Sequence, residues 1–222
     1  EEDRKARAPV GADSDAYYKA VHEWTDIVKA ADEMGVWGMS TIEHHLHSEG
    51  YEVGPNPGVL NAHWAAHTKN MHVGALGYVL ATQDPIRVAE QIAYLDLLCG
   101  GRCLFGFGRG AASVEYAGFR IPMEEARPRF AESAQLITKA LTDEVFEWDG
   151  EYYQIPKMSI RPRPMSHPER RFYASSVSPE SAEIMAKLGF GMMVIMQNEW
   201  TKAATDIQSF RDIAISVGHT PR

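Results

Sequence analysis

The chain alternates short apolar runs with longer amphipathic segments from end to end, and this alternation limits its fold more than any other feature. The apolar runs are residues 36–42, 71–81, 103–105, 171–176 and 191–196. Between them, apolar side chains recur at helical spacing, and the longest such segment begins at Ser14 and stops at Gly35. Strands separated by helices form parallel sheets with right-handed crossovers. The sequence therefore predicts an α/β fold.

Composition and charge narrow the class of protein. The chain has 222 residues, 45% of them apolar, and a formal net charge of −8. We expect one domain over residues 1–222, because this length can bury a substantial core. The negative charge, without a basic block, disfavours nucleic acid and anionic membranes as partners. No run approaches the roughly 20 apolar residues of a membrane span. The polar start does not resemble a secretory signal, so we expect a soluble, cytoplasmic protein.

A glycine-rich turn, Gly106-Phe107-Gly108-Arg109-Gly110, follows the apolar run at residues 103–105. Glycine leaves backbone N–H groups open to a ligand, and the guanidinium of Arg109 offers a planar fork of donors that matches a phosphate. We interpret the turn as a phosphate site at the carboxyl end of a strand. Two alternatives stay open: a dinucleotide fingerprint, which needs a helix directly after the turn, and a plain structural turn.

Polar residues also follow two other strands, as Glu43-His44-His45 and Ser175-Ser176-Val177-Ser178. In a closed barrel all strand ends open into one mouth, whereas an open sheet binds its ligand at a switch point. The barrel explains the convergence better, so we predict a TIM (β/α)8-type barrel. Five strands are recognisable, and a complete barrel would need one strand before Glu1 and others after Arg222. Residues 145–164 predict a β-hairpin insertion, and residues 47–58 and 110–122 predict loops that could form a lid.

A series of short motifs occurs in a fixed order along residues 15 to 200. The motifs are Glu43-His44-His45, Asn56-Pro57, Thr68-Lys69-Asn70 before Val73-Gly74, Asp84-Pro85-Ile86-Arg87-Val88-Ala89-Glu90, Gly100-Gly101-Arg102, the turn 106–110, and Arg127-Pro128-Arg129-Phe130. In this combination the chain resembles the bacterial luciferase-like family of flavin-dependent monooxygenases. The resemblance implies a TIM-type barrel that binds FMN at its carboxyl-end mouth. It also implies a homodimer or hetero-oligomer and a separate NAD(P)H-dependent reductase that supplies reduced FMN.

The resemblance also implies roles for individual residues. His44 matches the family's active-site histidine, although a purely structural histidine is the alternative. Arg109 matches the phosphate-binding arginine, assisted by Ser178 and the start of the helix at Pro179. The cofactor site is expected to comprise Leu76, Gly77, Phe107, Gly108, Arg109, Val177 and Ser178. Leu76-Gly77 matches the position where the family often has a non-prolyl cis peptide.

The implied reaction inserts one oxygen atom of O2 into a small or medium organic substrate through a flavin C(4a) hydroperoxide. Such a site must exclude water, and Leu46, Leu76, Phe105 and Phe107 are available as an apolar wall. We expect the ring of Phe107 to face the flavin's reactive edge. A deazaflavin-dependent hydride transfer in the same barrel and a non-catalytic flavin-binding protein are the alternatives.

A metal site is the competing interpretation of the histidines, because His45-Leu46-His47 has the H-x-H form of barrel metallohydrolases. That class needs further histidines on later strands, which the chain lacks after His72 apart from His167 and His219. We therefore predict no metal. His63 and His67 lack the glutamate of H-E-x-x-H.

Overall fold

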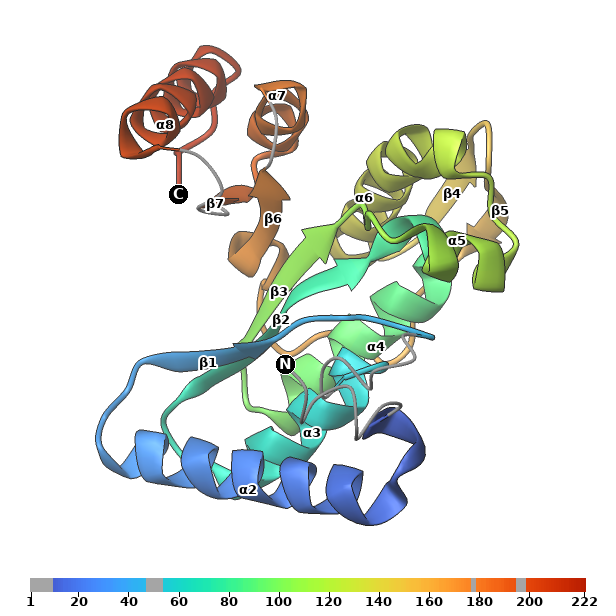
Figure 1. Cartoon of the computed structure of the whole chain (residues 1–222). Helices are drawn as coiled ribbons and strands as arrows, with labels where there is room; N and C mark the ends of the chain where they lie inside the picture. The colour runs from blue at the N-terminus through green and yellow to red at the C-terminus, as the bar shows by residue number, and fades with distance from the viewer. Residues whose placement is uncertain (1–9, 47–53, 177–178, 195–198) are drawn as a thin grey trace.

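A computed structural model describes residues 10–46, 54–176, 179–194 and 199–222. Five parallel strands form one sheet in the order β1-β2-β3-β6-β7. Their bounds are Gly38–Thr41 for β1, His72–Val79 for β2, Cys103–Gly108 for β3, Phe172–Ser176 for β6 and Gly191–Val194 for β7. Each strand pairs with the next parallel strand along the chain (Figure 1). This unbroken order is that of a barrel, since a doubly wound sheet reverses its strand order at a switch point. The predicted partial α/β barrel is confirmed.

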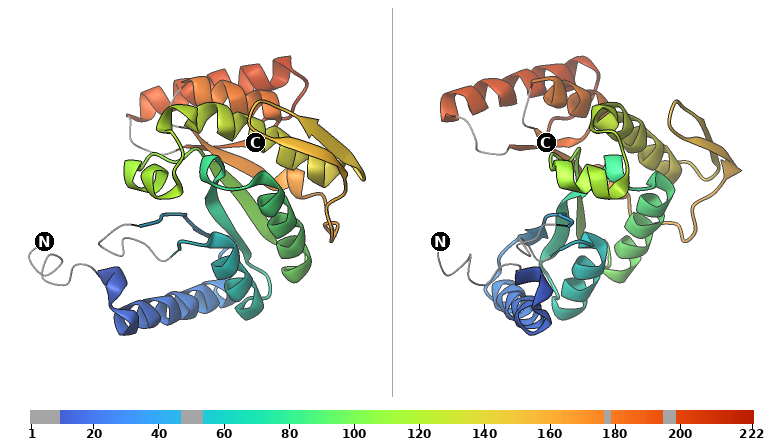
Figure 2. Two further views of the ribbon diagram at one scale, coloured as in Figure 1. Left: turned by 90° about the vertical axis from the view of Figure 1, so that its right-hand side faces the viewer. Right: turned by 45° about the vertical axis from the view of Figure 1, so that its right-hand side comes forward.

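Helices follow the strands as expected. They are α2 (Ser14–Glu33), α3 (Pro57–His67), α4 (Pro85–Leu98), α5 (Ser113–Phe119), α6 (Ala126–Thr142), α7 (Pro179–Leu188) and α8 (Trp200–Ser216), with short 3-10 turns η1 (Val10–Ala12), η2 (Leu80–Thr82), η3 (Met123–Glu125) and η4 (Pro168–Arg171). The side chain of Asp13 accepts the first N–H groups of α2, so this residue, and not Ser14, is the N-cap. Asp84 caps α4 in the same way. Figure 2 shows α3, α4 and α6 on one side of the sheet.

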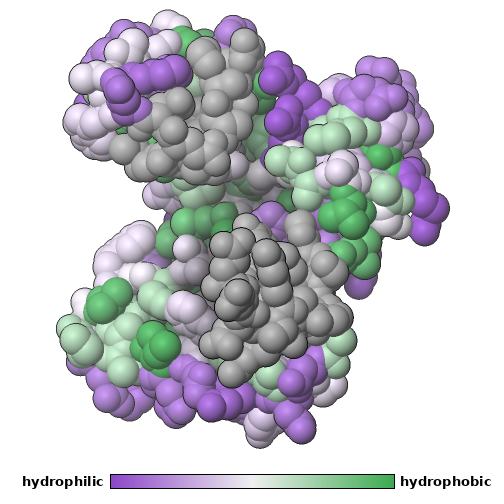
Figure 3. Space-filling view, in the orientation of Figure 1, coloured by the Kyte–Doolittle hydropathy of each residue, from purple (hydrophilic) through white to green (hydrophobic). Residues whose placement is uncertain are grey.

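The two faces of the sheet differ because side chains alternate along a strand. Phe105, Phe107 and Phe172 are fully buried and share one hydrophobic cluster with residues of α4, α6 and α7. The opposite face of β3 carries Leu104, Gly106 and Gly108. This face is turned away from α4, α6 and α7, and we call it the hollow side of the sheet. Figure 3 shows the molecular surface indented between the α2 side and the α7–α8 side of the molecule.

One extra residue interrupts the register between β2 and β3. Leu76 pairs with Gly106 and Tyr78 pairs with Phe107, so Gly77 has no partner and forms a bulge. The peptide bond between Leu76 and Gly77 is cis, as predicted. After the bulge, Tyr78 lies on the same face as Phe107 and is completely buried. The bulge therefore keeps Tyr78 out of the hollow.

Several motif residues stabilise the fold at the amino ends of the strands. Asp32 accepts the backbone N–H groups of residues 69, 70 and 71 at 2.7–3.0 Å, and these bonds lower its pKa although burial opposes them. The guanidinium of Arg102 donates to the carbonyl oxygen of Met71 at 2.7 Å and to three acceptors at the end of α3. Asp32 thus joins α2, and Arg102 joins the start of β3, to the connection between α3 and β2.

A second ionic cluster surrounds Asp96, whose side chain is fully buried. Arg171 donates to its carboxylate at 2.7 Å, and Ser166 donates through both its N–H and its hydroxyl at 2.8 Å. Arg171 also donates to the carbonyl oxygens of Gly101 and Cys103. Burial raises the pKa of Asp96, but the hydrogen bonds from Arg171 and Ser166 outweigh it and lower the pKa overall. This cluster joins α4, β3 and η4.

Strands β4 (Phe146–Asp149) and β5 (Gln154–Met158) pair as an antiparallel hairpin outside the sheet. Glu132 on α6 accepts the indole N–H of Trp148 and the backbone N–H groups of Tyr152 and Tyr153 at 3.0–3.1 Å. These three bonds attach the hairpin to α6. Among the described residues, none of the helices has the length and apolar composition required to cross a membrane.

Candidate active site at the strand ends

The candidate site lies where β1 and β3 end. His44 follows β1 and Arg109 follows β3, and a short helix that the sequence did not predict, α5, contacts both segments. Gly118 and Pro122 made residues 110–122 look like a loop. The helix could have been found from Tyr116 and Phe119, which are spaced for one helical face. The structure therefore corrects the predicted loop to a helix between Ser113 and Phe119.

Glu115 on α5 contacts both histidines of the motif. Its Oε1 lies 2.9 Å from Nδ1 of His44 and accepts the backbone N–H of His45 at 2.8 Å. The Glu115 side chain is only 1% exposed, whereas that of His44 is 34% exposed. A buried carboxylate thus lies behind a histidine that solvent or a ligand can reach. Sequence reasoning selected His44 and missed Glu115, which is 71 residues away.

Glu43 forms a second buried centre beside the first. Its Oε1 lies 2.8 Å from Nε2 of His45, and its Oε2 accepts the backbone N–H of Val79 and the side-chain amide of Gln83. The hydrogen bond with Glu43 raises the pKa of His45, while burial opposes the change. Because Val79 ends β2, Glu43 ties the exit of β1 to the exit of β2.

Arg109 lies at the other end of α5. The hydroxyl of Tyr116 donates to the carbonyl oxygen of Arg109 at 2.5 Å, which fixes the backbone of the turn. Burial raises the pKa of Tyr116, and the positive charge of Arg109 partly offsets this effect. Within the described residues, the guanidinium of Arg109 makes no hydrogen bond or ion pair. The turn therefore presents a cation that can meet an anion.

The two glycines before Arg109 have different roles. A Cβ atom at Gly106 would lie 2.5 Å from the carbonyl oxygen of Ala75, so glycine is needed there for β2 and β3 to pack closely. At Gly108 the nearest atom to an added Cβ would be Oγ of Ser175, at 3.7 Å. Leu76, Gly77 and Gly108 are partly exposed. The structure thus brings together four of the seven predicted cofactor residues: Leu76, Gly77, Gly108 and Arg109.

Phe107 does not face the hollow, and the expectation that its ring meets the cofactor is wrong. The ring is 0% exposed and packs at 4.9 Å from the ring of Phe172 and 5.5 Å from that of Phe190, measured between centroids. The physical reason is the alternation along β3, which places Gly106 and Gly108 on one face and Phe105 and Phe107 on the other. Phe105, another predicted wall residue, is buried on the same core face.

Val177 and Ser178, the remaining predicted cofactor residues, lie outside the described residues. The same holds for most of the predicted lid at 47–58, of which residues 54–58 are described. No group of three potential metal ligands occurs in the part of the chain that the structure describes. His63 is half-buried and contacts the hydroxyl of Thr25 at 3.2 Å.

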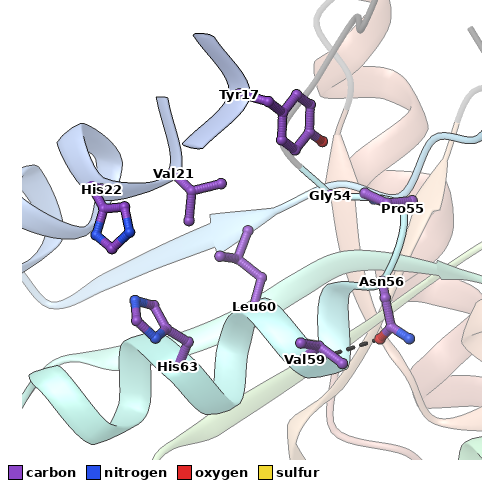
Figure 4. A pocket seen from close by; sticks show the side chains of 9 residues that line it. All are labelled: Tyr17, Val21, His22, Gly54, Pro55, Asn56, Val59, Leu60 and His63. Atoms are coloured by element: carbon purple, nitrogen blue, oxygen red, sulfur yellow. Dashed lines mark hydrogen bonds between the residues drawn. The ribbon is translucent and has the colours of Figure 1, made fainter. Parts of the chain in front are cut away.

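An apolar cavity of about 350 Å³ lies between α2 and α3 and is also lined by Gly54, Pro55 and Asn56 (Figure 4). Val21 and His22 reach it from α2, and Leu60 and His63 reach it from α3. Its lining shares no residue with the site built by His44, Glu115 and Arg109. The candidate active site is therefore defined by its polar groups and by the bare backbone, and not by this cavity.

The fold and these strand ends define a partial α/β barrel with a candidate site at the carboxyl ends of its strands, and comparison with known proteins gives the family. The profile of the family described as luciferase-like monooxygenase matches residues 6–222, so the chain belongs to this family. It is 30% identical over 174 residues to the oxygenase component of the flavin-dependent trigonelline monooxygenase of Acinetobacter baylyi, covering 78% of this chain and 48% of that protein.

Two solved structures have closely similar folds. The crystal structure of the monooxygenase RslO1 from Streptomyces bottropensis has a TM-score of 0.87 and 27% identity, and the match covers 93% of this chain and 63% of that one. The oxygenating constituent of 3,6-diketocamphane monooxygenase from Pseudomonas putida, in complex with FMN, has a TM-score of 0.78 and 22% identity, with 93% and 59% covered. The chain spans about half the length of the curated relatives it matches.

Proposed function

We propose that this chain forms the cofactor-binding part of a reduced-FMN-dependent monooxygenase that oxygenates a small or medium organic substrate. The observation that carries the proposal is the open backbone at Gly108 next to Arg109, whose guanidinium is unpaired among the described residues and whose carbonyl oxygen is held by Tyr116 of α5. Such a site suits a flat ring with a phosphate tail, since the ring needs backbone without Cβ atoms and the phosphate needs a fork of donors. Membership of the luciferase-like family supports this proposal.

Different residues of the chain would bind the phosphate, support the flavin ring and transfer protons. Arg109 and the turn N–H groups would hold the phosphate, with Ser178 as the proposed second contact. Leu76 and the backbone at Gly77 would support the ring. His44 would accept or return a proton at its exposed side, and general acid–base transfer of this kind typically contributes about 10²–10⁴-fold to a rate. Reduced FMN, when bound, supplies the electrons that activate O2.

We also propose that a separate NAD(P)H-dependent reductase supplies the reduced flavin, as the resemblance to the luciferase-like family implies. The trigonelline relative is named as an oxygenase component, which supports this two-component arrangement. Trigonelline is the first substrate to test, because it is the compound named for that relative.

The decisive experiment uses ¹⁸O2. Protein, FMN, a flavin reductase and NADH are incubated with trigonelline and with a panel of other small organic substrates, and the products are analysed by mass spectrometry. We expect one ¹⁸O atom in a product and no product when Arg109 is replaced by alanine at limiting FMN. If FMN binds but every substrate remains unlabelled while O2 is not consumed, the protein is a flavin binder without oxygenase activity. Tight binding of a deazaflavin in preference to FMN would instead support the hydride-transfer alternative.

A further inference from the structure

The two histidines of the candidate site are held by different carboxylates through different ring nitrogens. Nδ1 of His44 lies 2.9 Å from Oε1 of Glu115, and Nε2 of His45 lies 2.8 Å from Oε1 of Glu43. Both glutamates are almost completely buried. The pairing is therefore specific for each ring.

The hydrogen-bond pattern determines which nitrogen carries the proton. An amide N–H can only donate, so the Glu115 oxygen that receives the N–H of His45 is an acceptor. The same oxygen contacts Nδ1 of His44, and this nitrogen must then be the donor. In a neutral imidazole only one nitrogen carries a proton, so Nε2 of His44 is the basic nitrogen. His45 takes the opposite form, because a carboxylate oxygen can only accept and Oε1 of Glu43 contacts Nε2 of His45, while Oε2 accepts from Val79 and Gln83.

We propose that Glu115 is the positioning residue of the site: it holds His44 in the Nδ1–H tautomer, so that Nε2 is the nitrogen that exchanges protons in the reaction. Glu43 holds His45 in the Nε2–H tautomer. Glu115 acts through His44 and touches no reacting atom, and the catalytic part of this inference rests on the proposed function. The helix α5 makes the arrangement stiff, since Tyr116, the next residue, is bonded to the turn at Arg109.

The tautomers can be measured without cofactor or turnover. Long-range ¹H–¹⁵N spectra of the chain labelled with ¹⁵N-histidine, recorded above the pH at which the rings titrate, identify the unprotonated nitrogen of each ring. We expect Nε2 for His44 and Nδ1 for His45. In Glu115→Ala, His44 should no longer be restricted to the Nδ1–H tautomer and should show a mixture of both tautomers, while His45 is unchanged. Glu115→Gln keeps an acceptor oxygen and should preserve the tautomers of both rings. His45 is thus an internal control.

The wild-type spectrum alone can overturn the inference if His44 carries its proton on Nε2, even if Glu115→Ala fails to fold. An unchanged His44 tautomer in folded Glu115→Ala would overturn it as well.

A single-turnover measurement then separates this inference from the proposed function. Protein loaded with reduced FMN is mixed with O2, and the return of oxidised-flavin absorbance is followed. Because the misaligned His44 would transfer protons poorly, Glu115→Ala should lower this rate constant about 10²-fold, within the range for a positioned proton-transfer group, with FMN affinity within about threefold. Glu124→Gln, an exposed glutamate outside the site, is the matched control. If His44 in Glu115→Ala loses its tautomer preference but the rate constant is unchanged, His44 has no role in the reaction. If His44 keeps its tautomer preference in Glu115→Ala, Glu115 does not position it.

Discussion

The position of a single side chain on one or the other face of β3 decides what it can do. Leu104, Gly106 and Gly108 line the hollow, whereas Phe105 and Phe107 belong to the core under the helices. Each phenylalanine therefore contributes to stability, Gly106 permits the close approach of β2, and Gly108 leaves space for a ligand. A sequence that alternates glycine with phenylalanine in this way builds a site and a core from one strand.

Arg109→Ala should weaken FMN binding by about 1.5–3 kcal/mol, the range for charge-assisted hydrogen bonds. Riboflavin lacks the phosphate, so it should bind the wild type and the variant about equally. Titration of both flavins by fluorescence quenching tests this expectation. An equal loss of affinity for riboflavin and FMN would show that Arg109 does not bind the phosphate.

Phe107→Ala should destabilise the chain by about 3–5 kcal/mol, because it removes a fully buried ring from contact with Phe172 and Phe190. Chemical denaturation measures the free energy of unfolding. Phe107→Leu, which retains most of the apolar volume, should cost clearly less. Normal stability combined with a specific loss of FMN affinity in Phe107→Ala would place the ring in the site after all.

At the scale of helices and strands, features that depend on neighbouring residues could be predicted from the sequence, whereas features that depend on long-range contacts could not. The start of α4 after Asp84 could be predicted, because a cap and a proline act within a few residues. α5 was missed, since the spacing of Tyr116 and Phe119 is a weak signal over seven residues and the contacts of Glu115 and Tyr116 with distant segments are not visible in the sequence. The side of Phe107 was missed for a related reason, because alternation along a strand defines two faces but not which one the helices cover. His44 and Arg109 were selected from motifs, whereas Glu115 required the fold.

Arg171→Met should lower the free energy of unfolding by about 3–5 kcal/mol, because it leaves the carboxylate of Asp96 buried without its cation. The pKa of Asp96 is lowered in the folded chain. The stabilisation is therefore fully present above the unfolded value of about 3.9 and is lost as the pH falls through the folded pKa. Denaturation curves of wild type and variant should thus converge under strongly acidic conditions.

The exposed ion pair between Arg87 and Glu90 gives the matched control for this experiment. The side chain of Arg87 is 81% exposed, so Arg87→Met should change stability by less than about 1 kcal/mol. Equal effects of the two substitutions would show that burial of Asp96 is not what makes its pairing important.

For the molecule as a whole, the five-stranded sheet leaves apolar side chains at the surface. On α2 and its C-cap, Trp24, Ile27 and Met34 are 44%, 51% and 81% exposed, and Figure 3 shows hydrophobic surface on this side of the molecule. Exposed apolar patches of this kind mark contact surfaces. The family resemblance led us to expect an oligomer, and these residues are candidates for such a contact.

The 222-residue chain should therefore associate reversibly as its concentration rises. Sedimentation velocity should give a mass above that of the monomer. The double substitution Trp24→Gln and Ile27→Gln should raise the concentration needed for association about tenfold or more, because each substitution removes exposed apolar area from the contact. The control is Glu23→Gln with Asp26→Asn, two exposed polar positions on the same helix. A monomer at every concentration would contradict the prediction.

The hydrogen bonds of Glu43 and Glu115 at the end of β1 also have a use in protein engineering. Glu43 is bonded to Val79 of β2 and to Gln83, and Glu115 of α5 is bonded to His44 and His45. The start of the connection after β1 is therefore anchored to segments outside that connection. Asn56 anchors the other end, where its side chain caps α3 through the N–H of Val59. None of these bonds uses a residue from 47–53, so libraries of sequence variants can be built in that segment while both anchors are retained.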